Sequence, residues 1–336
     1  MRVGSVVYAT DQGLGILAKS FRDHGVVTDV AVVRHGRHQT HMVWYPGALE
    51  IADLRSPQSQ TALKFFCQDM DVMLFFETPF MWELMEACRS MRVKTVLMPM
   101  HECLHQRIWT CPPDLFLCPS LLDFQVVSGR GVRAEFLPVP VEVPWRLRER
   151  AEVFVHNAGH GGLRGRNGTA ELLQAWRLIE SPARLILRSQ GRQDWPPYPE
   201  LLSKDIELVQ ETVPYERLWD SGDVFVFPEK FNGLSLPLQE ARAAGLLVVT
   251  TDRFPDNSWL PSLPLVEPSS YRRARIGPPY QEFEEAVIDP RKIAEAVDSW
   301  YGRDIRDYSE SGQDWAERSS WAALGPKYLA LLESLL

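Results

Sequence analysis

The chain has 336 residues, of which 45% are hydrophobic and 24% charged, enough for two domains of ordinary size with a core in each. A net charge of −8 argues against a protein that coats nucleic acid, although it allows a local basic patch. No apolar run approaches the roughly 18 residues that a membrane span needs. The five cysteines form no CxxC pair and the N-terminus has no signal-peptide pattern, so we expect a cytoplasmic protein with reduced thiols.

The first elements alternate between strand and helix, as in a parallel α/β domain. Apolar patterns predict strands at Val3–Tyr8 and Val27–Val33, with a helix at Ile16–His24 between them. At the first strand-to-helix turn, Gly13 and Gly15 would let a ligand approach the backbone. A turn needed only for packing is the alternative, because the third glycine of the dinucleotide-binding fingerprint is absent.

The second strand leads into the most basic stretch of this half, RHGRHQTH from Arg34 to His41. One interpretation is a solvated loop. The other is a surface on which Arg34, Arg37 and His41 contact a ligand that carries phosphate.

Polar residues follow two later strands. The strand Asp71–Phe76 runs into Glu77, and the strand Val93–Met98, after a helix at Trp82–Met91, leads to His101. Open α/β sheets bind ligands at the carboxyl ends of their strands, so both residues are candidates, with helix capping or a neighbouring partner as the alternative. We expect no metal site here, because the spacing of the following residues matches no standard zinc pairing: His101, Cys103, His105 and Cys111.

A second α/β domain is predicted after a proline-rich linker that ends near residue 143. It starts with a strand at Val153 and continues into the loop HNAGHGGLRGRNG, which precedes a helix at Thr169–Ile179. The glycines would let backbone N–H groups close on a phosphate, and Arg164 and Arg166 would add permanent positive charge. A flexible surface loop is the alternative, since no GKS or GKT is present.

The segment from residue 224 to residue 252 predicts a strand–loop–helix–strand unit. Its strands are Val224–Phe227 and Leu246–Val249, and its helix Leu236–Ala244 is stopped by Gly245 and carries Glu240 about one turn from its start. Further predicted elements are strands at Arg184–Arg188 and Ile206–Val209, and helices at Pro214–Asp220, Asp289–Trp300 and Asp314–Leu336.

The sequence from Asn232 to Val249, NGLSLPLQEARAAGLLVV, resembles the motif E-G-F-G-L-P-x-x-E-A-x-A-x-G-x-P-V-V of GT-B-fold glycosyltransferases of the retaining family-4 type. The resemblance covers the chain in outline. It implies an α/β GT-B fold, with two Rossmann-like domains whose parallel sheets face each other across a cleft. Residues 1–143 would form the acceptor-side domain and residues 144–311 the donor domain, and the C-terminal helix, residues 312–336, would cross back to the first domain.

The resemblance also implies a nucleotide-diphosphate sugar as the donor, a UDP-hexose with glucose as the first choice, and no required cofactor or metal. Glu240 would bind the ribose hydroxyls, and His101 would contact the sugar from the opposite domain. The other implied donor contacts are Gly13, Gly15, Arg164, Arg166, Gly233, Leu234, Ser235 and Leu236. Asp11, Arg34, Arg37 and His41 would lie on the acceptor side.

Two departures from the family pattern bear on the site. Asn232 stands where the motif has the glutamate that touches the sugar, which puts the donor choice in question. Glu229 is a substitute that lies out of register. The arginine–lysine pair of the phosphate loop is also absent in register: Gly162 falls where the arginine would be and Asn167 where the lysine would be. We expect Arg164 and Arg166 to take the place of this pair.

The favoured mechanism is transfer with retention of configuration, which needs no strong general base. An inverting enzyme would need one, and Glu77, Asp11 and His101 are then the candidates. The acceptor is left open between a glycan or small metabolite and a hydroxymethylated pyrimidine in DNA, as modified by phage enzymes of this architecture. A scaffold that binds the nucleotide or sugar nucleotide without turnover, or a GT-B-fold epimerase, is the alternative. No membrane insertion or obligate protein partner is expected.

Overall fold

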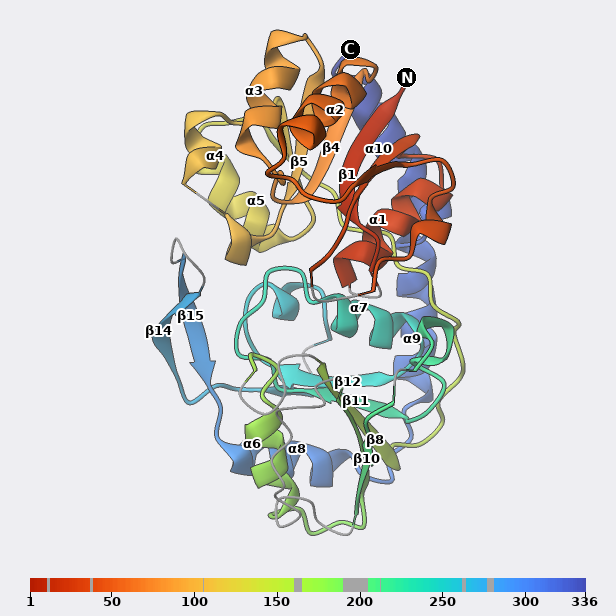
Figure 1. Cartoon of the computed structure of the whole chain (residues 1–336). Helices are drawn as coiled ribbons and strands as arrows, with labels where there is room; N and C mark the ends of the chain where they lie inside the picture. Colours follow the sequence, from red (N-terminus) through yellow and green to blue (C-terminus); the bar gives the residue numbers. More distant parts are fainter. Residues whose placement is uncertain are drawn as a thin grey trace. The chain divides into compact units, whose positions relative to one another are not determined.

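The structure is a computed structural model (Figure 1) that describes the chain except residues 11–12, 37–38, 105, 160–164, 190–204, 212, 262–263 and 277–280. The chain divides into two compact units. Met1–Pro140 and Trp321–Leu336 belong to the first unit, and Val141–Ile276 and Glu282–Ser320 belong to the second. No helix among the described residues is both long and apolar enough to cross a membrane.

The first unit is built on a seven-stranded parallel sheet in the order β3-β2-β1-β4-β5-β6-β7. Its strands are β1 (Val3–Tyr8), β2 (Asp29–Val33), β3 (Leu49–Ile51), β4 (Val72–Glu77), β5 (Lys94–Pro99), β6 (Leu115–Cys118) and β7 (Ala134–Phe136). Its described helices are α1 (Gly13–Asp23), η1 (Met42–Trp44), α2 (Pro57–Gln68), α3 (Trp82–Ser90), η2 (His101–Cys103), α4 (Arg107–Thr110), α5 (Leu121–Ser128) and α10 (Trp321–Glu333).

Both faces of this sheet are covered, which explains why its central strands are apolar at nearly every position. Phe75 points to the face covered by α2 and α3, whose buried residues include Leu63 and Leu84. On the other face, Phe21 of α1 lies edge-on to Phe76, at 5.2 Å between ring centroids. The same ring contacts α10 through Trp321 and Tyr328, at 4.8 and 4.9 Å.

The second unit has a six-stranded parallel sheet in the order β10-β9-β8-β11-β12-β13, and a separate two-stranded sheet of β14 and β15. Its strands are β8 (Val153–Gly159), β9 (Arg184–Ser189), β10 (Ile206–Val209), β11 (Val224–Phe227), β12 (Leu247–Thr251), β13 (Leu265–Val266), β14 (Ser270–Ile276) and β15 (Gln281–Val287). Its described helices are α6 (Thr169–Trp176), η5 (Tyr215–Arg217), α7 (Leu236–Ala243), η6 (Asp256–Ser258), α8 (Pro290–Trp300) and α9 (Arg306–Arg318).

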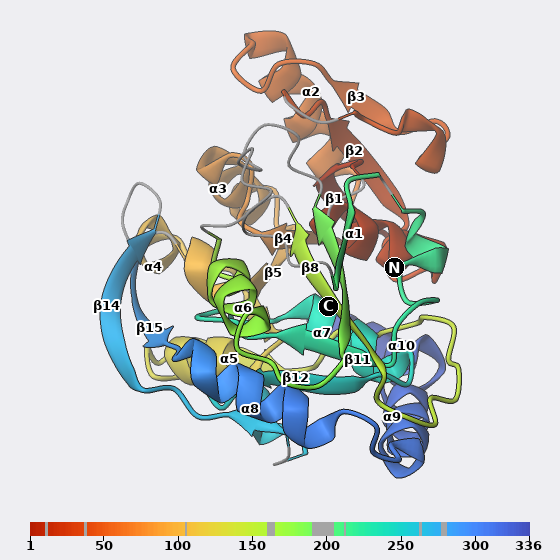
Figure 2. The same cartoon turned by 90° about the horizontal axis from the view of Figure 1, so that it is seen from below.

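Helices again cover both faces of the sheet, with α6 and α8 on one side and α7 and α9 on the other (Figure 1). Seen from below, α6 and α8 lie next to each other (Figure 2). Gly245 follows the end of α7, as predicted, and has φ 87°, a conformation that favours glycine. A side chain at this position would also meet the carbonyl oxygen of Arg146 at 2.4 Å. The two predicted parallel α/β domains are therefore confirmed.

Several elements have no counterpart in the sequence prediction, above all α2 and the β14–β15 pair. Helix α2 starts with Ser56, whose hydroxyl accepts a hydrogen bond from the Ser59 N–H, and with Pro57 at its first position. This N-terminal signal is present in the sequence. The β14–β15 pair is held at its base by tertiary contacts: the Ala286 N–H donates to the Lys230 carbonyl at 2.9 Å, and Phe283 stacks on Phe231.

Candidate functional site

The site of the second unit is centred on the loop between β11 and α7. Ser235, the last residue of this loop, has φ 46° and ψ 60°, a left-handed conformation that is unfavourable for a residue with a side chain. The family motif has glycine at this position, which adopts that conformation without strain. The loop is also held by Gln239 of α7, whose side-chain amide donates to the Leu234 carbonyl at 2.6 Å.

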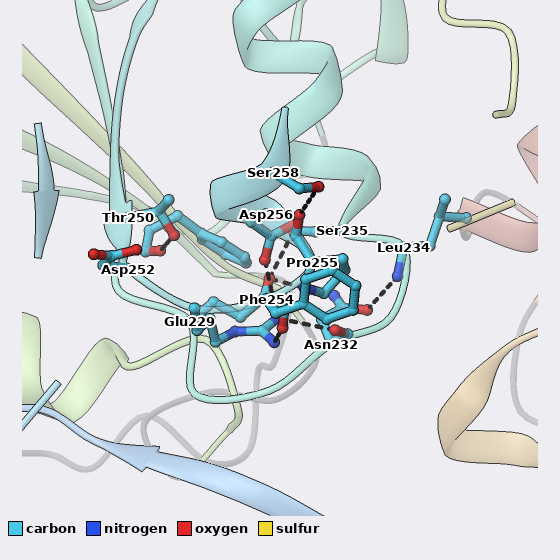
Figure 3. Close-up of polar contacts among 12 residues, drawn as sticks. Glu229, Asn232, Leu234, Ser235, Thr250, Asp252, Phe254, Pro255, Asp256 and Ser258 are labelled. Carbon is cyan, nitrogen blue, oxygen red and sulfur yellow. Dashed lines mark hydrogen bonds and ion pairs between the residues drawn. The ribbon is translucent and has the colours of Figure 1, made fainter. Parts of the chain in front are cut away.

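A buried carboxylate lies beneath the loop (Figure 3). Glu229 has no exposed surface and accepts hydrogen bonds from the Ser235 hydroxyl at 2.8 Å and from the Asn232 side-chain amide at 3.3 Å. Arg253, which follows β12, donates to the other oxygen of the same carboxylate at 2.6 Å. Glu229 is therefore enclosed by protein groups, and its carboxylate holds the loop in place.

Asn232, predicted as a sugar contact, takes part in the same network. Its side-chain oxygen accepts a hydrogen bond from the Leu234 N–H at 3.3 Å, and its carbonyl accepts one from Arg253 at 3.0 Å. A second buried carboxylate, Asp256 of η6, lies 3.0 Å from Arg253. Burial raises the pKa of Asp256, and the nearby charge of Glu229 raises it further, against the opposing effect of Arg253.

Glu240 lies one turn into α7 and has a partner that the sequence prediction missed. The hydroxyl of Tyr215, on η5, donates to the Glu240 Oε1 at 3.0 Å. Burial raises the pKa of Glu240 to about 7, and the hydrogen bond from Tyr215 opposes this rise. The carboxyl is therefore poised to gain or lose a proton near neutral pH, where a ligand that donates hydrogen bonds would favour the ionised form.

The predicted phosphate-binding loop is described only in part, since Arg164 lies outside the described residues. Arg166 lies over the ring of Phe231, with its guanidinium carbon 5.9 Å from the ring centroid. Its carbonyl accepts a hydrogen bond from the Lys230 N–H at 2.8 Å. Asn167, at the position of the family's lysine, donates to the carbonyls of Asn157 and Ala158 and so shapes the loop.

Two further contacts join this loop to the end of β11. Gly168 has φ 71°, and a side chain on it would meet the carbonyl oxygen of Pro228 at 2.0 Å. The buried imidazole of His156, in β8, donates from Nδ1 to the Val226 carbonyl and accepts at Nε2 from the Thr169 hydroxyl, both at 2.8 Å. Burial lowers the pKa of His156 to about 4, so the ring is neutral and serves as a link between β8, β11 and α6.

The predicted residues of the first unit lie at the carboxyl ends of its strands. Glu77, the last residue of β4, has φ 64° and accepts a hydrogen bond from the Cys103 thiol at 2.8 Å. His101 begins η2 after β5, and burial lowers its pKa, with Glu102 acting in the opposite direction. Asp123 of α5 has its pKa raised to about 7 by burial. Glu77 and His101 thus lie on the predicted edge of this sheet.

The remaining first-unit predictions have local explanations or lie outside the described residues. Gly15 packs so tightly that a side chain would meet the Thr10 carbonyl oxygen at 2.1 Å, and Gly13 begins α1. Arg34 forms an ion pair with Glu50, and His41 stacks on Trp44. Asp11 and Arg37 are outside the described residues. Within the described part of the chain, no three His, Cys, Asp or Glu side chains are grouped as metal ligands would be.

Comparisons with known proteins agree with this geometry. Residues 158–258 match the family model described as Glycosyl transferases group 1. HepE from Anabaena, solved in complex with UDP, is similar over 99% of this chain and 100% of that chain, with a TM-score of 0.71 and 12% identity. A glycosyltransferase from Rickettsia africae has a TM-score of 0.69 and 10% identity over 99% of this chain and 98% of its own.

Sucrose-phosphate synthase from Thermosynechococcus elongatus is also similar, with a TM-score of 0.68 and 13% identity over 100% of this chain and 99% of that one. No sequence among the curated proteins matches the chain. The predicted GT-B fold is thus confirmed, and the residues that match the glycosyltransferase group 1 model, 158–258, include β11, α7 and the loop between them.

Proposed function

We propose that the protein transfers a hexose from a nucleoside diphosphate sugar, with UDP-glucose as the first donor to test, to a hydroxyl group of an acceptor. The observation that carries this proposal is the pairing of Glu240 with Tyr215 inside the group 1 domain. A half-buried carboxylate beside a conformationally fixed loop suits a ribose diol, because it can accept two hydrogen bonds. The HepE structures, solved in complexes with UDP, with UDP-glucose, and with UDP and glucose, support this choice of donor.

The proposed roles follow from the chemistry of the leaving group. Breaking a glycosyl–phosphate bond develops negative charge on the diphosphate, which fixed positive groups and backbone N–H groups stabilise. Arg166 and the undescribed Arg164 would supply the positive charge, and the residues from Gly233 to Leu236 would supply N–H groups. His101 would contact the sugar as a neutral imidazole, consistent with the lowered pKa of that ring.

We further propose that transfer proceeds with retention and without a metal ion. The departing phosphate can take the proton of the acceptor hydroxyl on the same face of the sugar, so no strong base is needed. The anomeric configuration of the product, measured by NMR, tests retention. An inverted product would require a general base, and Glu77, Asp11 and His101 would then be the candidates. Activity that persists in EDTA supports the metal-free proposal, and a strict need for Mg²⁺ contradicts it.

The decisive experiment assays the purified chain with a panel of nucleotide sugars and follows the release of free nucleotide. Acceptors in the panel should include simple glycans, plain DNA and hydroxymethylated DNA, because the acceptor class is open. Glu240→Ala should raise the donor KM by ~30-fold, which corresponds to about 2 kcal/mol for hydrogen bonds to a charged group. Wild-type binding of UDP without turnover of any donor would instead indicate a non-catalytic scaffold.

A further inference from the structure

Two of the three positions at which the loop departs from the family motif are in contact with one buried group. Asn232 replaces the glutamate of the motif and Ser235 replaces its second glycine. Both side chains donate hydrogen bonds to the same oxygen of Glu229, the Oε2, at 3.3 and 2.8 Å. One carboxylate without exposed surface therefore holds both ends of the segment Asn232–Ser235 (Figure 3).

Arg253, which follows the neighbouring strand β12, completes the attachment. A single guanidinium nitrogen, Nη2, lies 2.6 Å from the Glu229 Oε1, 3.0 Å from the Asn232 carbonyl oxygen and 3.0 Å from the Asp256 Oδ2. Arg253 is only 6% exposed, and both carboxylates are at most 1% exposed. A charged group in such surroundings keeps its place only while its partners remain, because an unpaired buried charge is strongly unfavourable.

The backbone of Ser235 makes this attachment necessary. At φ 46° the backbone of Ser235 is strained because the residue has a Cβ atom, whereas glycine would adopt the same angles without strain. The hydrogen bond from the Ser235 hydroxyl to Glu229 offsets that strain, and the amide of Asn232 holds the other end of the segment to the same carboxylate. A carboxylate at position 232 could not do so, because it would lie against the carboxylate of Glu229 and repel it.

We propose that Glu229 and Arg253 are positioning residues for the donor: they lock the segment Asn232–Ser235 in the conformation that binds the nucleotide sugar. On this proposal the changes at Asn232 and Ser235 belong together, because both side chains are hydrogen-bonded to Glu229. This inference rests on the proposed function for the identity of the ligand. It concerns residues that act through the loop and do not touch the substrate.

The sharpest test compares two substitutions of Ser235. Ser235→Ala removes the hydroxyl and leaves a strained Cβ, so we expect the KM for UDP-glucose to rise at least about tenfold with a smaller change in kcat. Ser235→Gly also removes the hydroxyl but removes the strain with it, so the rise should stay below about threefold. If Ser235 served only for packing, the donor KM should rise more in Ser235→Gly than in Ser235→Ala, because glycine loses more contacts and makes the chain more flexible.

Two further variants examine the charged partners. Asn232→Asp should raise the donor KM at least as much as Ser235→Ala, and the added substitution Glu229→Gln should recover part of that loss, because it removes the repulsion. Arg253→Lys should retain more donor affinity than Arg253→Met, since lysine keeps the charge. Ser309→Ala is the matched control: it deletes an equally buried hydroxyl, which accepts from the Arg148 N–H at 3.0 Å, and should lower the Tm without changing the donor KM.

Direct binding of UDP-glucose, measured by calorimetry beside the kinetic assay, distinguishes a failure of the proposed function from a failure of the positioning role. If the wild-type chain neither binds nor turns over any nucleotide sugar, the proposed function fails and this inference fails with it. If the wild type binds the donor but Ser235→Gly is as weak as Ser235→Ala, or weaker, only the positioning role is overturned. The positioning role is likewise overturned if Glu229→Gln gives no recovery in the Asn232→Asp background.

Discussion

The raised pKa of Glu240 predicts that binding of the proposed donor depends on pH in a defined direction. In the free protein, burial places this pKa at about 7, so about half of the molecules carry a protonated carboxyl at pH 7. In the proposed complex a ribose diol would donate hydrogen bonds to the carboxylate and would therefore bind the ionised form. Binding of UDP-glucose should thus become tighter as the pH rises, and should release ~0.5 proton per molecule bound at pH 7.

The size of the effect follows from the same pKa. If the bound-state pKa lies well below 6, the ionised fraction of the free protein rises from about 9% at pH 6 to about 91% at pH 8. The affinity should therefore increase ~10-fold, which is about 1.4 kcal/mol, and should level off above pH 8. UDP-glucose is preferable to UDP as the ligand, because its diphosphate is esterified at both ends and does not titrate in this range.

Isothermal titration calorimetry in buffers of different ionisation enthalpy measures both the affinity and the released proton. Glu240→Gln is the control, because the amide keeps the size of the side chain and cannot titrate. Its affinity should be lower at pH 8 and nearly independent of pH. A pH dependence of equal steepness in Glu240→Gln, or a flat profile in the wild type, would refute the assignment of Glu240 to the ribose.

Two more predictions concern the surroundings of this group. Tyr215→Phe removes a hydrogen bond that lowers the pKa of Glu240, so the midpoint of the pH profile should move up by roughly one unit, measured with the same titrations. Gly168→Ala would force a side chain into the carbonyl oxygen of Pro228 at positive φ and should lower the free energy of unfolding by at least about 1–3 kcal/mol in urea. Gly36→Ala, whose side chain would enter open space, is its control, and equal losses in both variants would contradict the clash.

Two glutamates near the start of α7 differ in their surroundings in a way that their sequence positions do not show. Glu229 lies in the loop before α7 and Glu240 lies in α7 itself. Glu229 is enclosed by Ser235, Asn232 and Arg253, whereas Glu240 is half-buried beside Tyr215. An enclosed carboxylate whose oxygens are already bonded is suited to hold a loop. A half-buried one with a raised pKa is suited to receive a ligand.

The strands and helices that carry the site were largely predictable from apolar patterns. The predicted strands Val3–Tyr8, Ile206–Val209 and Val224–Phe227 agree with β1, β10 and β11 at both ends. Strands covered on both faces are apolar throughout, which makes them easy to find. By contrast, the β14–β15 pair is rich in arginine and glutamate, and its place depends on contacts with Lys230 and Phe231 that no local pattern encodes.

The sequence by itself determined two parallel α/β domains and the position of the loop before α7, because hydrophobic periodicity and glycine positions act over a few residues. It also identified Asn232 as a departure from the family motif. Only the tertiary structure decided what compensates for that departure. Glu229 lies in the loop before α7, whereas Arg253 and Asp256 lie close together after β12, and the three buried side chains meet because burial favours the pairing of each charge. Tyr215 reaches Glu240 in the same way, across 25 residues of sequence, because the sheet brings η5 and α7 together.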